Sequence, residues 1–281
     1  YGIPPFEVIR PTVESDYSGT FNYRSADPSI AGFSTSTITI SSTGTVTLFA
    51  DILGDDKYNA RTVTATLIVE KSNQSIIVEP LPIEKPLKDF TSLTVSATST
   101  SGDQVIVSLV SGSAANLSGS VGNYSLNNIN QTGLVTITFT VPESQNYYSA
   151  TVTAVIDVIK TNQSITVSPV TPTFIYYQEN LVYTINAFSD STLDLTYTLV
   201  SGTNATLSGN VLNISDIGEL VVEINQLGDN IYNPAITKRE VIKVVQGITY
   251  LSNFNIPDKY VDDDNFVIPK PTSNRSGNYI H

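Results

Sequence analysis

The sequence predicts an all-β chain built from tandem β-sandwich modules, and three observations support this prediction. Apolar and polar residues alternate along many short segments, which is the pattern of half-buried antiparallel strands. Turn signals such as Ser-Gly, Gly-Asn and Gly-Asp separate these segments every 8–12 residues or so, as sandwich folds require. The same order of segments then recurs, and such long periods with strand content indicate tandem domains.

Four features mark each repeat. A glycine opens an alternating strand, and a polar or acidic loop then ends in a tyrosine. Another alternating strand follows, and the next module opens with a motif of the type Asn-Gln-Ser-Ile. The glycines are Gly44, Gly133 and Gly218, and the tyrosines are Tyr58, Tyr147 and Tyr232. The spacing between successive glycines is 89 and then 85 residues.

The phase of the repeats predicts four segments. Residues 1–71 form a module that lacks its first strand, 72–160 and 161–245 form complete modules, and 246–281 begin a further one. The third module follows the second through a link of four residues, Lys160 to Gln163. Because the chain has no initiator methionine and both ends fall within a repeat, we expect it to be an interior piece of a longer protein.

The alternation also predicts which side chains face the core. In the strand that begins at Gly133, one face carries only apolar residues and the other carries threonines. The same pattern follows the loops that end in Tyr147 and Tyr58. The residues predicted to point inward are Val135, Ile137, Phe139 and Val141, then Val152, Ala154, Ile156 and Val158, and in the first module Val63, Ala65, Leu67 and Val69.

Composition excludes several classes of function. A net charge of −12 disfavours binding to nucleic acid, because phosphate contacts need clusters of Lys and Arg. The same charge disfavours binding to anionic lipid, and no apolar run approaches the ~18 residues of a membrane span. The chain has no Cys and no Trp, so the Cys–Trp–Cys core of antibody domains is absent.

The motifs resemble a known group of repeats. Their order is Asn-Gln-Ser-Ile, a proline-containing strand, a Leu-Val-Ser-Gly…Leu-Ser-Gly stretch (108–119 and 198–209), the glycine strand and the Asn-x-Tyr loop. This order resembles the bacterial immunoglobulin-like (Big/MBG-type) repeats of bacterial surface adhesins and of surface or fibre proteins of phages and large DNA viruses. The resemblance implies tandem immunoglobulin-like sandwiches in an elongated array and carries no catalytic residues.

Two kinds of candidate site recur with the modules. We expect Tyr58, Tyr147 and Tyr232 to be structural, each with its ring over the sandwich end and its hydroxyl on a backbone group, as in a tyrosine corner. The three glycines are expected to be structural as well. Asn73 and Asn162, in the repeated opening motif, are candidate glycosylation sites because each begins an Asn-x-Ser sequon.

Acidic clusters raise the alternative of a bound cation. Asp262, Asp263 and Asp264 are consecutive, and further acids lie at Asp55, Asp56 and Asp229. Calcium needs six to eight converging oxygen ligands, and no Asp-x-Asp-x-Asp spacing with a bidentate glutamate supplies them. We therefore expect solvated loops and no cofactor, with calcium as the alternative.

The sequence predicts that the chain is not an enzyme. Its single histidine, His281, has no cysteine or Gly-x-Ser-x-Gly serine with which to form a catalytic pair. The expected role is a structural spacer in an extracellular, cell-surface or virion-surface protein, with neighbouring modules of the same chain as partners. One alternative is a module that binds a host glycan or receptor through end loops such as Tyr147–Tyr148 and Tyr176–Tyr177. Another is a fibre subunit that self-associates by strand exchange.

Overall fold

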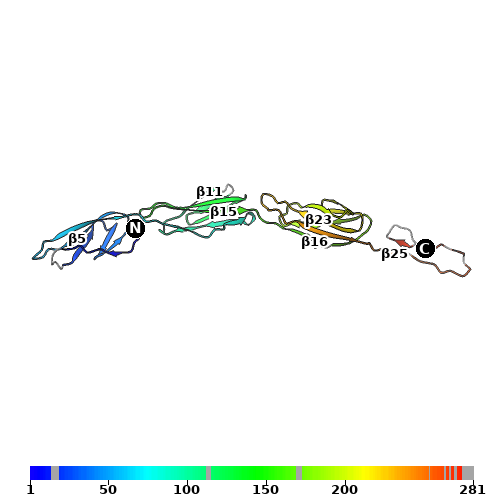
Figure 1. Ribbon diagram of the computed structural model, residues 1–281, viewed down its shortest axis with the longest axis horizontal. Coiled ribbons are helices and arrows are strands. Elements are labelled where there is room, and N and C mark those ends of the chain that lie inside the picture. The colour runs from blue at the N-terminus through cyan, green and yellow to red at the C-terminus, as the bar shows by residue number, and fades with distance from the viewer. Residues whose placement is uncertain are drawn as a thin grey trace. The chain divides into compact units, whose positions relative to one another are not determined.

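The computed structural model describes residues 1–13, 19–111, 115–168, 173–252, 254–262, 264–265, 267–268 and 271–273. In these residues the regular structure is all β, apart from one short 3-10 helix, η1 (Leu87–Asp89). The chain divides into two compact units, Tyr1–Lys160 and Thr161–His281. The first unit contains two sandwiches, and the second contains a third sandwich and the residues that follow it (Figure 1). None of the described helical structure is long and apolar enough to cross a bilayer.

The third module shows the immunoglobulin arrangement. One layer consists of β16 (Ile165–Ser168) paired with β19 (Asn186–Ser189), and of β18 (Leu181–Thr184), β22 (Val211–Ile214) and β21 (Ala205–Ser208) in that order. The other layer has the order β17 (Thr173–Tyr176), β24 (Lys238–Val245), β23 (Gly218–Asn225) and β20 (Thr196–Ser201). The opening segment thus pairs first with one layer through β16 and then, in parallel, with the other through β17.

The second module repeats this order. In the first layer, β7 (Ile76–Val78) pairs with β10 (Ala97–Ser99), and β9 (Ser92–Val95) pairs with β13 (Asn123–Asn127), which pairs with β12 (Asn116–Ser120). In the second layer, the order is β8 (Glu84–Pro86), β15 (Ala150–Ile159), β14 (Gly133–Val141) and β11 (Ile106–Ser111). Again β8 is parallel to β15. The fold class predicted from sequence is therefore confirmed as tandem immunoglobulin-like sandwiches.

The first module has a smaller set of strands. One layer is β1 (Phe6–Glu7), β4 (Thr37–Ile40) and β3 (Ala31–Ser34), and the other is β2 (Phe21–Ser25), β5 (Gly44–Ile52) and β6 (Arg61–Val69). Its core is built on Ala31, Ile38 and Val46. Beyond the third module, β25 (Leu251–Ser252) pairs antiparallel with β26 (Thr272–Ser273).

The prediction of inward faces is confirmed in the strand that begins at Gly133 and is wrong in part of the strands after the tyrosine loops. Val135, Ile137, Phe139 and Val141 are all buried, whereas Val63 and Val152 are 43% and 38% exposed, and Ala65 is exposed as well. Both of these valines lie in the first half of a long strand, β6 or β15. The buried part of each strand lies at its other end, where β15 also gains the parallel partner β8 at Asp157–Ile159. Alternation fixes the side of the sheet, but the core covers only part of the strand's length.

The repeated glycines have a conformational reason. Gly44, Gly133 and Gly218 each begin a long strand, with φ angles of 147°, 134° and 145°. Residues with a Cβ rarely adopt this region, so glycine is the residue that enters the strand without strain. A Cβ at Gly133 would meet no atom within 4 Å, which shows that the backbone angle and not lack of space requires glycine there.

Candidate functional site

The glutamine of the repeated opening motif is buried just before the first strand of the third module. Gln163 is 8% exposed, and its Nε2 donates to the side-chain oxygen of Gln226 and, at 2.7 Å, to the carbonyl oxygen of Asn233. Its Oε1 accepts from the hydroxyls of Ser189, at 2.8 Å, and Ser191. One amide thus joins the opening segment to the end of β19 and to the β23–β24 connection.

The second module has the same arrangement around Gln74, which is also 8% exposed. Its Nε2 donates to the carbonyl oxygens of Tyr148, at 2.7 Å, and Pro142, at 3.4 Å. Its Oε1 accepts from the Ser101 hydroxyl at 2.6 Å. Burying a side-chain amide costs little free energy when both its nitrogen and its oxygen are hydrogen-bonded, and these bonds fix the positions of its partners. We call Gln74 and Gln163, with these partners, the glutamine hubs.

Sequence reasoning identified the Asn-Gln-Ser motif as a repeat marker but not the role of its glutamine. The neighbouring Asn73 and Asn162, the candidate glycosylation sites, are both exposed. The side-chain oxygen of Asn162 accepts a hydrogen bond from Asn233 at 2.9 Å. The signal for the hub was the phase of the strand: counting back by two from the buried Ile165 places Gln163 on the inward side.

The predicted four-residue link is shorter than expected. Thr161 forms a parallel bridge with Tyr232, its N–H donates to the Ile231 carbonyl, and its carbonyl accepts from Asn233 N–H. Thr161 and Gln163 therefore belong to the body of the third module. In the second module, Ser72 forms the corresponding bridge with Tyr147.

The tyrosine loops are closed by their own backbone and, in two modules, by an acid. The carboxylate of Asp55 accepts from the N–H groups of Lys57 and Tyr58, each at 2.8 Å. Asp229 accepts in the same way from Ile231, at 2.7 Å, and Tyr232, at 2.8 Å. These are Asx turns, which give both acids a structural use. The hydroxyl bonds expected for Tyr58, Tyr147 and Tyr232 stay a prediction.

Within the first unit, the Tyr147 loop also meets the first module. The backbone N–H of Thr43 donates to the side-chain oxygen of Asn146 at 2.9 Å, and the Thr43 hydroxyl donates to the Gln145 carbonyl at 2.7 Å. Lys71 forms an ion pair with Glu143 and donates to the Ser144 carbonyl at 2.8 Å. We call this set of contacts the first junction.

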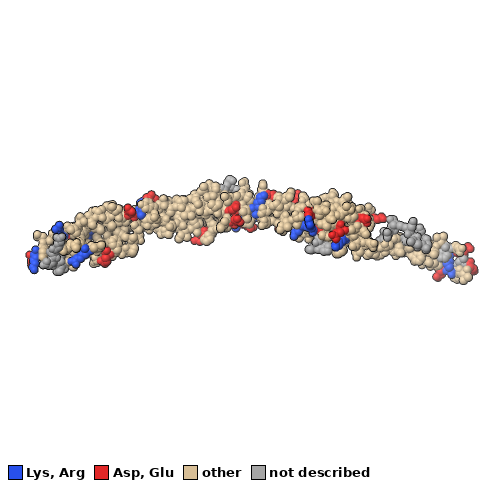
Figure 2. Space-filling model, viewed as in Figure 1, with Lys and Arg blue, Asp and Glu red and all other residues tan. Residues whose placement is uncertain are grey.

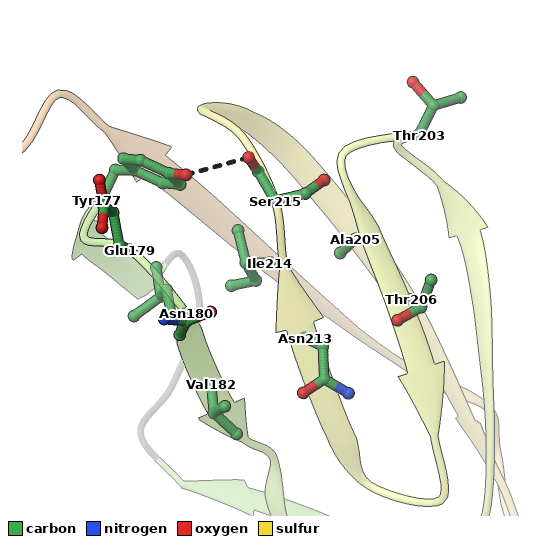
Figure 3. A pocket seen from close by; sticks show the side chains of 11 residues that line it. Tyr177, Glu179, Asn180, Val182, Thr203, Ala205, Thr206, Asn213, Ile214 and Ser215 are labelled. Carbon is green, nitrogen blue, oxygen red and sulfur yellow. Dashed lines mark hydrogen bonds between the residues drawn. The ribbon is translucent and has the colours of Figure 1, made fainter. Parts of the chain in front are cut away.

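A shallow groove of about 580 Å³ lies on the third module over β18, β22 and β21. Val182, Asn213 and Thr206 form one row across these strands by register. At one end of the groove the Tyr177 hydroxyl donates to the Ser215 carbonyl at 3.1 Å, which fixes the ring (Figure 3). The lining also includes Glu179 and is otherwise made of amides, hydroxyls and aliphatic groups. Of the aromatic residues proposed as contacts, Tyr148 and Tyr176 are exposed.

The acidic candidates for calcium do not form a cluster in the described structure. Asp262 and Asp264 are exposed, and Asp263 lies outside the described residues. No group of three or more His, Cys, Asp or Glu side chains able to hold a metal occurs among the residues described. Figure 2 shows acidic and basic side chains scattered over a mostly uncharged surface on the face in view.

Comparisons with known proteins return only distant structural similarity. No family model matches the chain, and no curated protein matches it. Drosophila N-cadherin EC1-3 is 13% identical, with a TM-score of 0.32 and coverage of 86% of this chain and 93% of that one. The z1z2 domains of titin, in complex with telethonin, are 12% identical, with a TM-score of 0.41 and coverage of 63% and 98%. Domains 4–9 of the surface layer protein SbsC are 14% identical, with a TM-score of 0.26 and coverage of 86% and 42%. The fold assignment rests on the strand order and register described above.

Proposed function

We propose that this chain is a non-enzymatic spacer within a larger extracellular or surface protein, of a cell or a virion, and that its modules act as a stalk. The observation that carries the proposal is the first junction. A flexible tether would leave the two modules independent, whereas here Thr43 and Lys71 bind one loop of the next module through both backbone and side chain. The resemblance of the repeats to those of surface adhesins and fibre proteins supports the location.

The junction can be tested by measuring distances between spin labels. Because the chain has no native cysteine, Thr39→Cys and Thr94→Cys place labels at one exposed site in each of the first two modules. We expect a narrow distance distribution in the full chain. Thr43→Val with Asn146→Ala removes two hydrogen bonds, about 2 kcal/mol in total, and should broaden it.

Thr45→Val is the matched control, because Thr45 is an exposed threonine two residues further on. It should leave the distribution narrow. A broad distribution in the unaltered chain would contradict the stalk, since modules that move freely do not hold a distance.

The groove on the third module favours a second candidate function, the binding of a neutral glycan. Its amides and hydroxyls suit a polyhydroxylated ligand, and the immobilised Tyr177 ring offers an apolar surface. Asn213, at its centre, is exposed and able to donate and accept.

A glycan array probed with the full chain tests this candidate. Asn213→Ala should weaken any bound glycan about tenfold, since it removes roughly one to two hydrogen bonds. Thr198→Ala, at an exposed position on β20 of the same module, should have no effect. An array without hits, or hits that Asn213→Ala leaves unchanged, would exclude the groove as a glycan site.

A further inference from the structure

Glu240 is an acid in the core of the third module. It lies on β24, its side chain is fully buried, and it shares the inward face of the strand with Ile242 and Val244. Its cross-strand partner on β23 is Val222, which is also fully buried. Among the residues that the structure describes, Glu240 is the one buried acidic or basic residue.

In the part of the chain that the structure describes, the carboxyl group has one hydrogen-bond partner. The Thr173 hydroxyl, on β17, donates to Oε1 at 2.8 Å. Oε2 is buried and has no hydrogen-bond partner in the described structure. A carboxylate in this position would be poorly solvated, so burial favours the neutral carboxylic acid. Burial raises the pKa of Glu240 above the ordinary 4.5, and the Thr173 hydrogen bond opposes this only in part.

The other two modules do not have an acid at this position. The three glycine strands define the register, because Gly44 pairs with Val69, Gly133 with Val158 and Gly218 with Val244. Four residues before these valines lie Ala65, Ala154 and Glu240. The sandwich therefore forms without a carboxyl group at this place, and the acid is particular to the third module.

Among the residues described, no basic side chain forms a hydrogen bond or an ion pair with Glu240. Arg239 forms an ion pair with Glu223, and Lys243 with Glu219 at 3.4 Å, at positions that alternate with the inward face. Lys238, two residues before Glu240 on the same side of β24, is exposed. Three partly buried phenols, Tyr177, Tyr183 and Tyr197, pack on the same core. From β17 the polar group that faces Glu240 is the Thr173 hydroxyl.

We propose that Glu240 is a proton-dependent latch of the third module: the core accommodates the neutral carboxyl group with β17 packed on β24, and ionisation, which leaves a charge in the core, loosens the module as the pH rises. The latch would be specific to this module. β17 is the strand that closes the second layer in parallel with β24, so loosening it opens the edge of that layer.

The sign of the pH dependence follows from the two states. In the unfolded chain Glu240 loses its proton near the ordinary pKa of 4.5, whereas the folded module retains it to higher pH because burial raises the pKa. The stabilising effect of this proton is complete below pH 4.5 and is lost as the pH rises through the folded pKa. Between these two values the folding equilibrium constant falls up to tenfold per pH unit.

Hydrogen exchange of the full chain between pH 4.5 and 8, corrected for the intrinsic exchange rate, tests the latch. We expect protection of β23 and β24 to fall by up to tenfold per unit relative to β14 and β15 of the second module. Glu240→Gln should remove this dependence while preserving the shape of the side chain. If Glu240→Gln does not fold, Glu240→Ala serves instead, because alanine occupies the place in the other two modules.

Three further variants separate the latch from a merely structural role. Thr173→Val removes the hydrogen bond that favours the ionised form of Glu240. It should therefore extend to higher pH the range over which the stability of the third module falls. Asp190→Asn controls for the other acid of the module with a shifted pKa, which Ser164 lowers, and should leave the alkaline loss unchanged. Ala154→Glu should confer the same dependence on the second module. Parallel pH profiles for the unaltered chain and Glu240→Gln would overturn the proposal.

Discussion

Phe139→Ala is expected to lower the free energy of unfolding of the second module by about 3–5 kcal/mol, the usual cost of deleting a buried aromatic ring. Phe139 lies on β14, is fully buried, and pairs with Val107 and Val152 on the neighbouring strands. The side chains around Phe139 are held by β-strands of the sandwich. They can therefore fill only part of the cavity that the substitution leaves. Hydrogen exchange resolved by module, or calorimetry, measures the effect.

The third module should keep its stability in this variant. Each module has a core of its own, and the core cluster of the third contains only residues from Ile165 onward. Leu134→Ala, on the same strand but 59% exposed, is the matched control and should cost well under 1 kcal/mol. An equal loss in residues 161–245 would show that the predicted boundary at 160–161 does not separate two folding units.

Gln163→Ala is expected to destabilise the third module by about 3 kcal/mol. The substitution removes the four hydrogen bonds of the Gln163 amide, each worth about 0.5–1.5 kcal/mol. Ser189 and Ser191 still bond to each other, and Gln226 still accepts from the Gly228 N–H. Chemical denaturation of the full chain, followed by module-resolved exchange, measures the loss.

Two comparisons make the result specific to the hub. Gln74→Ala should destabilise the second module to a similar or smaller extent, since Gln74 has three partners, one of them at 3.4 Å. Thr166→Ala, at an exposed position on β16, should change little. If Gln163→Ala and Thr166→Ala had equal effects, water would replace the amide and the hub would not stabilise the fold.

The fold was predictable because the cores follow a local pattern. The period-two alternation of Val135, Ile137 and Phe139 can be recognised from neighbouring residues alone. The repeated glycines mark strand starts, where the backbone has a φ near 140°. The extent of burial was less predictable. Val63 and Val152 carry the inward pattern but lie where the strand extends past its core, and that limit depends on the length of the opposite layer.

The polar sites were harder to predict because their partners are distant in the sequence. Gln163 is bonded to residues 26–70 positions away, so its burial cannot be inferred from its neighbours alone. The Asx turns of Asp55 and Asp229 are local, and the recurrence of an acid before the tyrosine already indicated them. Glu240 followed the inward alternation with Ile242 and Val244, but only the structure shows that its Oε2 is buried without a hydrogen-bond partner among the described residues.

The glutamine hubs have a consequence for where such a chain can fold. Many small sandwich domains join their layers or loops with a disulfide, which forms only where an oxidant is present. Here, in the third module, an amide joins the opening segment, the end of β19 and a distant loop, and the chain contains no cysteine. The modules therefore have the same cross-connections in a reducing cytoplasm as outside the cell. Thiol reductants should leave their stability unchanged, and their folding needs no oxidative step during synthesis or export.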